Sequence, residues 1–150
     1  MSEVSTAGPD EAHLESNMRK VALTALAGTS IEWYDFFLYA TAAALVFPSA
    51  FFPGSDPTIG LTLSFGTFAF GFIARPLGGV LFGHWGDRIG RKKTLVIALV
   101  MMGIASTAIG LLPTYSTIGV AAPILLSLLR FAQGLAIGGQ WGGAMLLVTE

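Results

Sequence analysis

Apolar residues fill four long stretches of the chain, and short polar segments separate them. The stretches cover about residues 21–47, 58–83, 94–112 and 120–148. A helix crosses the hydrocarbon core of a membrane with about 20 apolar residues, so each stretch is long enough to span it. We therefore predict an all-α membrane protein with four transmembrane helices, the longer of which have room to tilt.

The only dense cluster of charge in the apolar part of the chain separates the second stretch from the third. It covers residues 83–93 and sets four basic residues against the single acid Asp87; these are Arg88, Arg91, Lys92 and Lys93. Lysine and arginine in short loops mark the cytoplasmic side of a membrane protein. The pattern predicts a tight cytoplasmic turn between the second and third helices.

The same rule orients the other connections. Arg19 and Lys20 precede the first stretch, whereas the loops over residues 48–57 and 113–119 contain no basic residue. We expect both loops to be external, with the N-terminus and Glu150 in the cytoplasm.

The first 18 residues carry four acids and no lysine or arginine. An acidic start of this kind excludes a secretory signal, which begins with a basic segment. Because little in it could be buried, we expect residues 1–18 to form a disordered cytoplasmic tail, with a short amphipathic helix as the alternative.

Composition supports a membrane location. The chain is 53% hydrophobic and 11% charged, with a mean hydropathy of +0.71, whereas a soluble domain is about 25% charged. A soluble four-helix bundle would need polar outer faces, which these stretches lack. The chain has no cysteine and two distant histidines, so we expect no metal site and no cofactor.

Four charged residues lie inside the apolar stretches: Glu32, Asp35, Arg75 and Arg130. Charge in hydrocarbon is costly, and it usually faces a partner or a water-filled path. Glu32, Asp35 and Tyr39 share one helical face, since they follow one another at intervals of three and four residues. Glu32 and Arg130 both lie about 15–18 Å deep by helical rise, near the midplane.

We therefore expect Glu32, Asp35, Tyr39, Arg130 and Gln133 to line a polar cavity. An acid there could exchange a proton, and the arginine could hold a carboxylate or alter the protonation of the acid. The alternative is a permanent structural ion pair that joins the first and fourth helices.

Other residues predict helix packing and gating. Arg75 is expected near the cytoplasmic interface, where it either snorkels or has a gating or structural role, without direct contact with the solute; Pro76 after it favours a kink. Gly134, Gly138 and Gly142 lie at four-residue spacing, which allows helices to pack closely and slide.

Several motifs resemble the major facilitator superfamily. The pattern of Gly83, Asp87, Arg88, Gly90 and Arg91 is similar to its signature between helices two and three, and Arg130-x-x-x-Gly134 is similar to a second signature in helix four. The segments at 32–36, 75–79 and 138–143 resemble the metabolite:proton symporters, which import shikimate, 2-oxoglutarate, citrate, proline or betaine. The likeness covers about residues 20–150.

This resemblance implies a twelve-helix transporter with two six-helix halves that works by alternating access. The chain would then be a fragment holding the first four helices of the N-terminal half, inactive without the C-terminal helices. The resemblance assigns Gly83, Asp87, Arg88, Gly90 and Arg91 to a cytoplasmic latch. It associates Arg130 with proton coupling. Relatives often have a glutamate at the position of Gln140, which shifts the expected coupling to Glu32 and Asp35.

The expected function is uptake across the inner (plasma) membrane of a small organic solute together with protons. The solute would be a carboxylate such as shikimate or a zwitterion such as proline or betaine. The expected partners are membrane lipids, the solute, the proton and the missing C-terminal helices, but no nucleic acid. The alternatives are a self-contained oligomeric four-helix transporter or channel, and a structural membrane subunit. The sequence shows no nucleophile paired with a base, so nothing in it indicates an enzyme.

Overall fold

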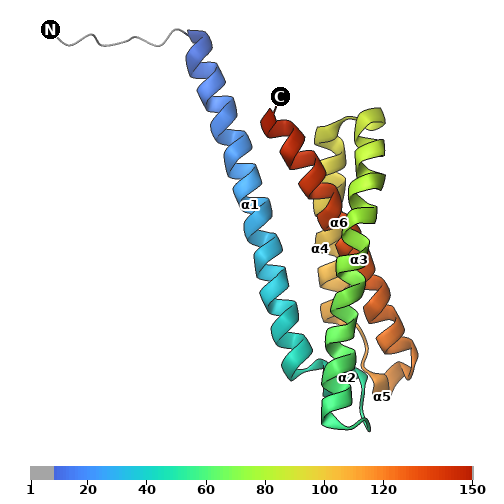
Figure 1. Ribbon diagram of the computed structural model, residues 1–150. Coiled ribbons are helices and arrows are strands. Elements are labelled where there is room, and N and C mark those ends of the chain that lie inside the picture. Colours follow the sequence, from blue (N-terminus) through green and yellow to red (C-terminus); the bar gives the residue numbers. More distant parts are fainter. Residues whose placement is uncertain (1–8, 150) are drawn as a thin grey trace, which may run out of the picture.

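The computed structural model describes residues 9–149, which form helices without any strand. The helices are α1 (Pro9–Leu45), α2 (Phe47–Phe51), α3 (Pro57–Ile89), α4 (Arg91–Leu111), α5 (Tyr115–Ile118) and α6 (Ala121–Thr149). Helices α3, α4 and α6 run side by side, while α1 leans away from them towards its N-terminal end (Figure 1). The predicted all-α architecture is confirmed.

Three helices are long and apolar enough to cross a membrane within the described part of the chain: Pro57–Ile89, Arg91–Leu111 and Ala121–Gly142. Helix α1 is not among them, and its apolar part contains the two acids Glu32 and Asp35, which lower its mean hydropathy. The expected span over residues 21–47 therefore stays a prediction.

Helix α1 begins earlier than the sequence suggested. Residues 9–18, expected to belong to a disordered tail, form its first turns, whereas residues 1–8 lie outside the described residues. Proline suits the first turn of a helix, and Pro9 opens this one. Glu11 follows at the positive end of the helix dipole, which also favours a helix start here.

The connection between α3 and α4 is tighter than predicted. Instead of a turn over residues 83–93, α3 continues through Pro76 to Ile89, and α4 starts after the single residue Gly90. Gly90 has φ +103° and ψ +133°, a conformation that side-chain-bearing residues rarely adopt. The glycine thus lets the chain reverse within one residue.

Helices α3 and α6 touch through their backbones. A Cβ on Gly78 would overlap the backbone of Leu135, and a Cβ on Gly138 would overlap the carbonyl oxygen of Arg75. Only glycine permits this approach, which maximises dispersion contacts between helices in lipid. Helix α4 packs on the other side of α6, where Met102 meets Ala136 and Ile137.

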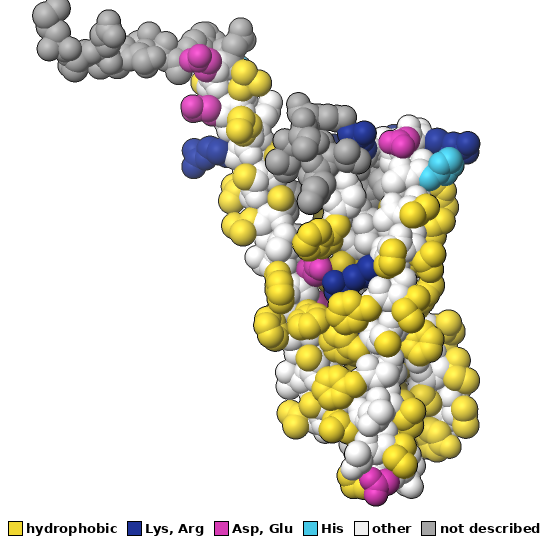
Figure 2. All heavy atoms as spheres, viewed as in Figure 1, with side chains coloured by type: hydrophobic (Ala, Val, Ile, Leu, Met, Phe, Trp, Pro, Cys, Tyr) yellow, Lys and Arg dark blue, Asp and Glu magenta, His cyan; other side chains and the backbone are white. Residues whose placement is uncertain are grey.

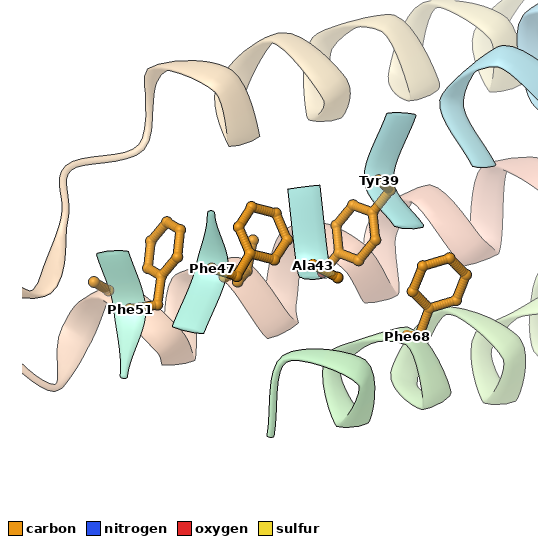
Figure 3. Packing of buried hydrophobic residues seen from close by; sticks show 7 residues of the cluster. Tyr39, Ala43, Phe47, Phe51 and Phe68 are labelled. Carbon is orange, nitrogen blue, oxygen red and sulfur yellow. The ribbon is translucent and has the colours of Figure 1, made fainter. Parts of the chain in front are cut away.

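The C-terminal end of α1 packs on this three-helix body through aromatic residues (Figure 3). Tyr39 meets Phe47 of α2 and Phe68 of α3 edge to face, with ring centroids 5.1 and 5.0 Å apart. The buried cluster comprises Tyr39, Ala43, Phe47, Phe51, Phe68, Ala122 and Leu126. This apolar attachment brings the charged face of α1 against α4 and α6.

Candidate functional site

The carboxylate of Asp35 lies where α1, α4 and α6 meet, and the residue is only 8% exposed. Its Oδ2 accepts a hydrogen bond from Nη1 of Arg130 at 3.1 Å. Its Oδ1 accepts from Nε2 of Gln133 at 3.1 Å and from the hydroxyl of Ser106 at 2.8 Å. Both oxygens are therefore bonded, as a buried charge requires.

Asp35, Ser106, Arg130 and Gln133 form a closed network, which we call the Asp35 cluster. Oε1 of Gln133 accepts a hydrogen bond from Nη1 of Arg130 at 2.7 Å, and Nε2 of Gln133 also donates to the hydroxyl of Ser106 at 2.7 Å. Gln133 thus bonds the acid, the base and the hydroxyl together. The network ties α1 to both α4 and α6.

The guanidinium of Arg130 lies between two aromatic rings. Its Cζ is 4.0 Å from the ring centroid of Tyr39 and 4.7 Å from that of Phe68, which are cation–π distances. Its Nε is buried and has no hydrogen-bond partner within the described residues. A Cβ on Gly71 would lie 3.1 Å from this Nε, so the glycine leaves room for the arginine.

The hydroxyl of Tyr39 fixes the ring that faces Arg130. It is 2.6 Å from Oγ1 of Thr67, and that hydroxyl lies 2.6 Å from the carbonyl oxygen of Ser64, to which it donates. Because the threonine proton is used there, the tyrosine donates to Thr67. This bond links α1 to α3 beside the Asp35 cluster.

Glu32 lies apart from the Asp35 cluster, in contrast to the single cavity that we expected. Its carboxylate accepts from the indole Nε1 of Trp141 at 2.9 and 3.2 Å, and its Oε1 is 4.0 Å from Nη2 of Arg75. We call Glu32, Arg75 and Trp141 the Glu32 site. Three residues rise about 4.5 Å along a helix, so Glu32 meets different neighbours from those of Asp35.

The Glu32 site gives Arg75 partners that the sequence did not suggest. Its guanidinium faces Glu32 and lies 4.6 Å from the ring centroid of Phe72, while its expected position near the cytoplasmic interface stays a prediction. Figure 2 shows basic and acidic side chains together amid hydrophobic surface, midway along the helices.

Sequence reasoning missed three polar partners: Ser106, Thr67 and Trp141. Each is a polar or amphipathic residue inside an apolar stretch, and such residues usually bond across helices. That pattern could have marked them as candidates. It could not say which acid or ring each one would reach.

Residues 20–150 match the family model for sugar (and other) transporters. The chain belongs to this family. It is accordingly a membrane protein of the major facilitator superfamily, as its motifs predicted, and not an enzyme. No solved structure matches the chain.

Relatives of this transporter family are similar over most of the chain. An inner membrane metabolite transport protein, YhjE of Escherichia coli, is 57% identical over 90% of this chain and 31% of its own length. The shikimate transporter of Escherichia coli is 55% identical over 95% of this chain and 33% of its own length. The proline/betaine transporter of Salmonella typhimurium is 43% identical over 91% of this chain and 27% of its own length. The chain thus spans about a third of these relatives.

The transporter-family signature between α3 and α4 surrounds the Gly90 turn. Asp87 and Arg91 lie four residues apart on either side of it, with Oδ1 and Nη2 4.0 Å apart, and the side chain of Asp87 is 73% exposed. Arg88 is in the last turn of α3. A Cβ on Gly83 would meet no described atom within 4 Å. The latch role of these residues stays a prediction.

Two of the three glycines expected to pack α6 lie in its contact with α3. A Cβ on Gly134 would overlap the carbonyl oxygen of Gly71, just as one on Gly138 would overlap that of Arg75. Gly142 does not belong to this contact, since a Cβ there would meet no atom within 4 Å in the described part of the chain. Packed helices cross at an angle, so their closest contact has a limited length.

Gln140 faces α4. It is buried, and its Nε2 lies 3.5 Å from the sulfur of Met102 in α4. Among residues 9–149, no three histidine, aspartate or glutamate side chains converge as metal ligands would.

Proposed function

We propose that this chain supplies helices of a secondary active transporter that imports a small organic solute with protons by alternating access. The solute is a carboxylate such as shikimate or a zwitterion such as proline or betaine. The remaining helices of the transport pathway correspond to the two thirds of the relatives that the chain does not match.

The buried Asp35 cluster is the observation that carries this proposal. Asp35 receives bonds from Ser106 and Gln133 in addition to its ion pair with Arg130. These neutral donors stay bonded to a carboxyl oxygen whether or not the acid carries a proton. The cluster can therefore hold both protonation states of Asp35.

Protonation of Asp35 would remove the charge that holds Arg130 and would weaken the attachment of α1 to α6. Helix α1 packs on the body mainly through its C-terminal end, so its N-terminal part is free to shift when this bond weakens. A change in protonation would thus shift the balance between two arrangements of α1, as alternating access requires.

A chimera tests the proposal. This chain replaces the matching third of the shikimate transporter of Escherichia coli, in cells that lack their own copy. We expect the chimera to accumulate labelled shikimate, and a protonophore to abolish accumulation. Asp35→Asn should lose accumulation, whereas the control Asp56→Asn, which changes an exposed helix cap outside the spans, should keep most of it.

Two results would count against the proposal. One is full proton-driven accumulation by the Asp35→Asn chimera. The other is a chimera that reaches the membrane in normal amounts but accumulates no shikimate. Accumulation by this chain alone would favour the self-contained oligomer instead.

We also propose that the N-terminus, the Gly90 turn and residue 150 face the cytoplasm and that α1 spans the membrane. The chain has no cysteine, so single cysteines report the side of each loop. In intact cells, a membrane-impermeant maleimide should label Ser55→Cys in the loop before α3. It should label Lys92→Cys only after the cells are permeabilised, and labelling of Lys92→Cys in intact cells would reverse the orientation.

A further inference from the structure

The two acids on α1 are bonded in different ways. Asp35 accepts from three donors and is enclosed, whereas the only hydrogen-bond donor to Glu32 within the described residues is the indole of Trp141. Arg75 stands 4.0 Å from Glu32, beyond hydrogen-bond distance. The Glu32 site thus holds its carboxylate loosely.

Arg75 has donors to spare. Within the described residues its guanidinium makes no hydrogen bond, and its contacts are the distant Glu32 carboxylate and the ring of Phe72. An arginine offers five N–H donors in a planar fork that matches a carboxylate. The indole N–H of Trp141 points at the same carboxylate from α6, so donors from two helices converge on one acceptor position.

The base of the Glu32 site is more accessible than the base of the Asp35 cluster. The side chain of Arg75 is 30% exposed, compared with 3% for Arg130, whereas the two acids are almost equally exposed, Glu32 by 12% and Asp35 by 11%. Figure 2 shows acidic and basic side chains side by side between α1 and α3. A solute could reach Arg75, whereas Arg130 is closed off by Asp35, Gln133 and two rings.

We propose that Arg75 and Trp141 bind the carboxylate of the transported solute, which displaces Glu32 from the indole N–H of Trp141 and takes up the unused donors of Arg75. This inference rests on the proposed transport function, and it moves the carboxylate site from Arg130, where the sequence suggested it, to Arg75. In the empty site the carboxylate of Glu32 lies where the carboxylate of the solute would bind. The class of solute is accordingly any small molecule with a free carboxylate, whether an anion or a zwitterion.

Displacement of an internal carboxylate makes a clear prediction about affinity. If Glu32 occupies the indole N–H of Trp141 for about nine tenths of the time, the apparent affinity of the site for a solute carboxylate is reduced about tenfold. Removing the charge of Glu32 should therefore strengthen binding, whereas removing that of Arg75 should weaken it. A purely structural Glu32–Arg75 pair predicts no such opposite effects.

Tryptophan fluorescence can measure this binding directly. The chain has three tryptophans, so Trp33→Phe and Trp85→Phe leave Trp141 as the only reporter. This variant, in lipid nanodiscs without a proton gradient, is titrated with shikimate and with the uncharged methyl ester of shikimate. We expect a saturable change in emission with shikimate and none with the ester.

In this background, Glu32→Gln should tighten shikimate binding about tenfold, and Arg75→Gln should weaken it at least tenfold. The control Glu15→Gln removes an acid far from the site on the same helix and should leave binding unchanged. Glu32→Ala should show the same direction as Glu32→Gln, which excludes an effect of the new amide.

The inference is overturned if Glu32→Gln weakens binding as Arg75→Gln does, or if the ester binds as well as the acid. It is also overturned if Trp141 shows no saturable response to shikimate up to about 10 mM. Accumulation of shikimate by the chimera without binding at Trp141 would refute this inference alone. Binding without proton-driven accumulation would refute the proposed function and leave the carboxylate site standing.

Discussion

The contact between the backbones of α3 and α6 predicts that alanine at Gly78 destabilises the chain. A Cβ there would overlap the carbonyl oxygen of Leu135 and would lie 2.7 Å from its Cα. Carbon atoms in contact are about 3.5–4.0 Å apart, so the two helices must separate by about 1 Å. Backbone atoms cannot rotate aside, so the separation affects the whole contact.

Gly66 provides a matched control on the same helix. A Cβ there meets no described atom within 4 Å, so Gly66→Ala changes only helix propensity. Alanine gains about 1 kcal/mol over glycine in a helix, and this gain is common to both variants. Their difference in stability is therefore the cost of overpacking, about 1–3 kcal/mol.

Unfolding of the purified chain by dodecyl sulfate in mixed micelles, followed by far-UV circular dichroism, measures this difference. We expect Gly66→Ala to match or exceed the original chain in stability, and Gly78→Ala to be about 1–3 kcal/mol less stable than Gly66→Ala. Equal stability of the two alanine variants would mean that α3 and α6 do not touch through their backbones, and it would refute the packing described for them.

Other variants test the charged face and the turn by the same unfolding measurement. Asp35→Leu should lower the free energy of unfolding by about 3–5 kcal/mol, because it leaves Arg130 buried without its acid. The double variant with Arg130→Met should lose less stability than Asp35→Leu alone. If the losses of the two single variants simply add up in the double variant, Asp35 and Arg130 do not pair directly. Tyr39→Phe should cost about 1 kcal/mol, because it removes the hydrogen bond to Thr67, and no loss would contradict that bond. Gly90→Ala should cost about 1–3 kcal/mol, since its φ of +103° suits glycine alone, and an unchanged stability would mean that the turn has another conformation.

Much of the fold follows from the sequence because lipid restricts the choices. Unpaired backbone groups are too costly in hydrocarbon, so long apolar stretches must be helices. Their predicted limits lie within three residues of those of α4 and α6, whereas α3 continues six residues beyond its predicted end. The prediction failed at residues 9–18, where polar residues form a helix that hydrophobicity alone does not reveal.

The candidate site could be predicted only in part. Helical periodicity placed Asp35 and Tyr39 on one face of α1, and the structure sets both beside Arg130 and Gln133. The same periodicity grouped Glu32 with them, yet Glu32 meets Arg75 and Trp141. Spacing along one helix says which side chains share a face, but it carries no information about the neighbouring helix.

The sequence by itself determined that intramembrane acids and bases exist in equal number, that they lie on helices, and that glycines allow α6 to pack closely. Only the tertiary structure decided that Asp35 pairs with Arg130 while Glu32 pairs with Arg75. Which base each acid meets depends on the angle at which the packed helices cross and on how each helix is rotated about its axis. For α3 and α6, the contacts of Gly78 and Gly138 fix this arrangement. A shift of one helical turn, about 5.4 Å, would exchange the partners of these acids, and no pattern along a single helix fixes that register.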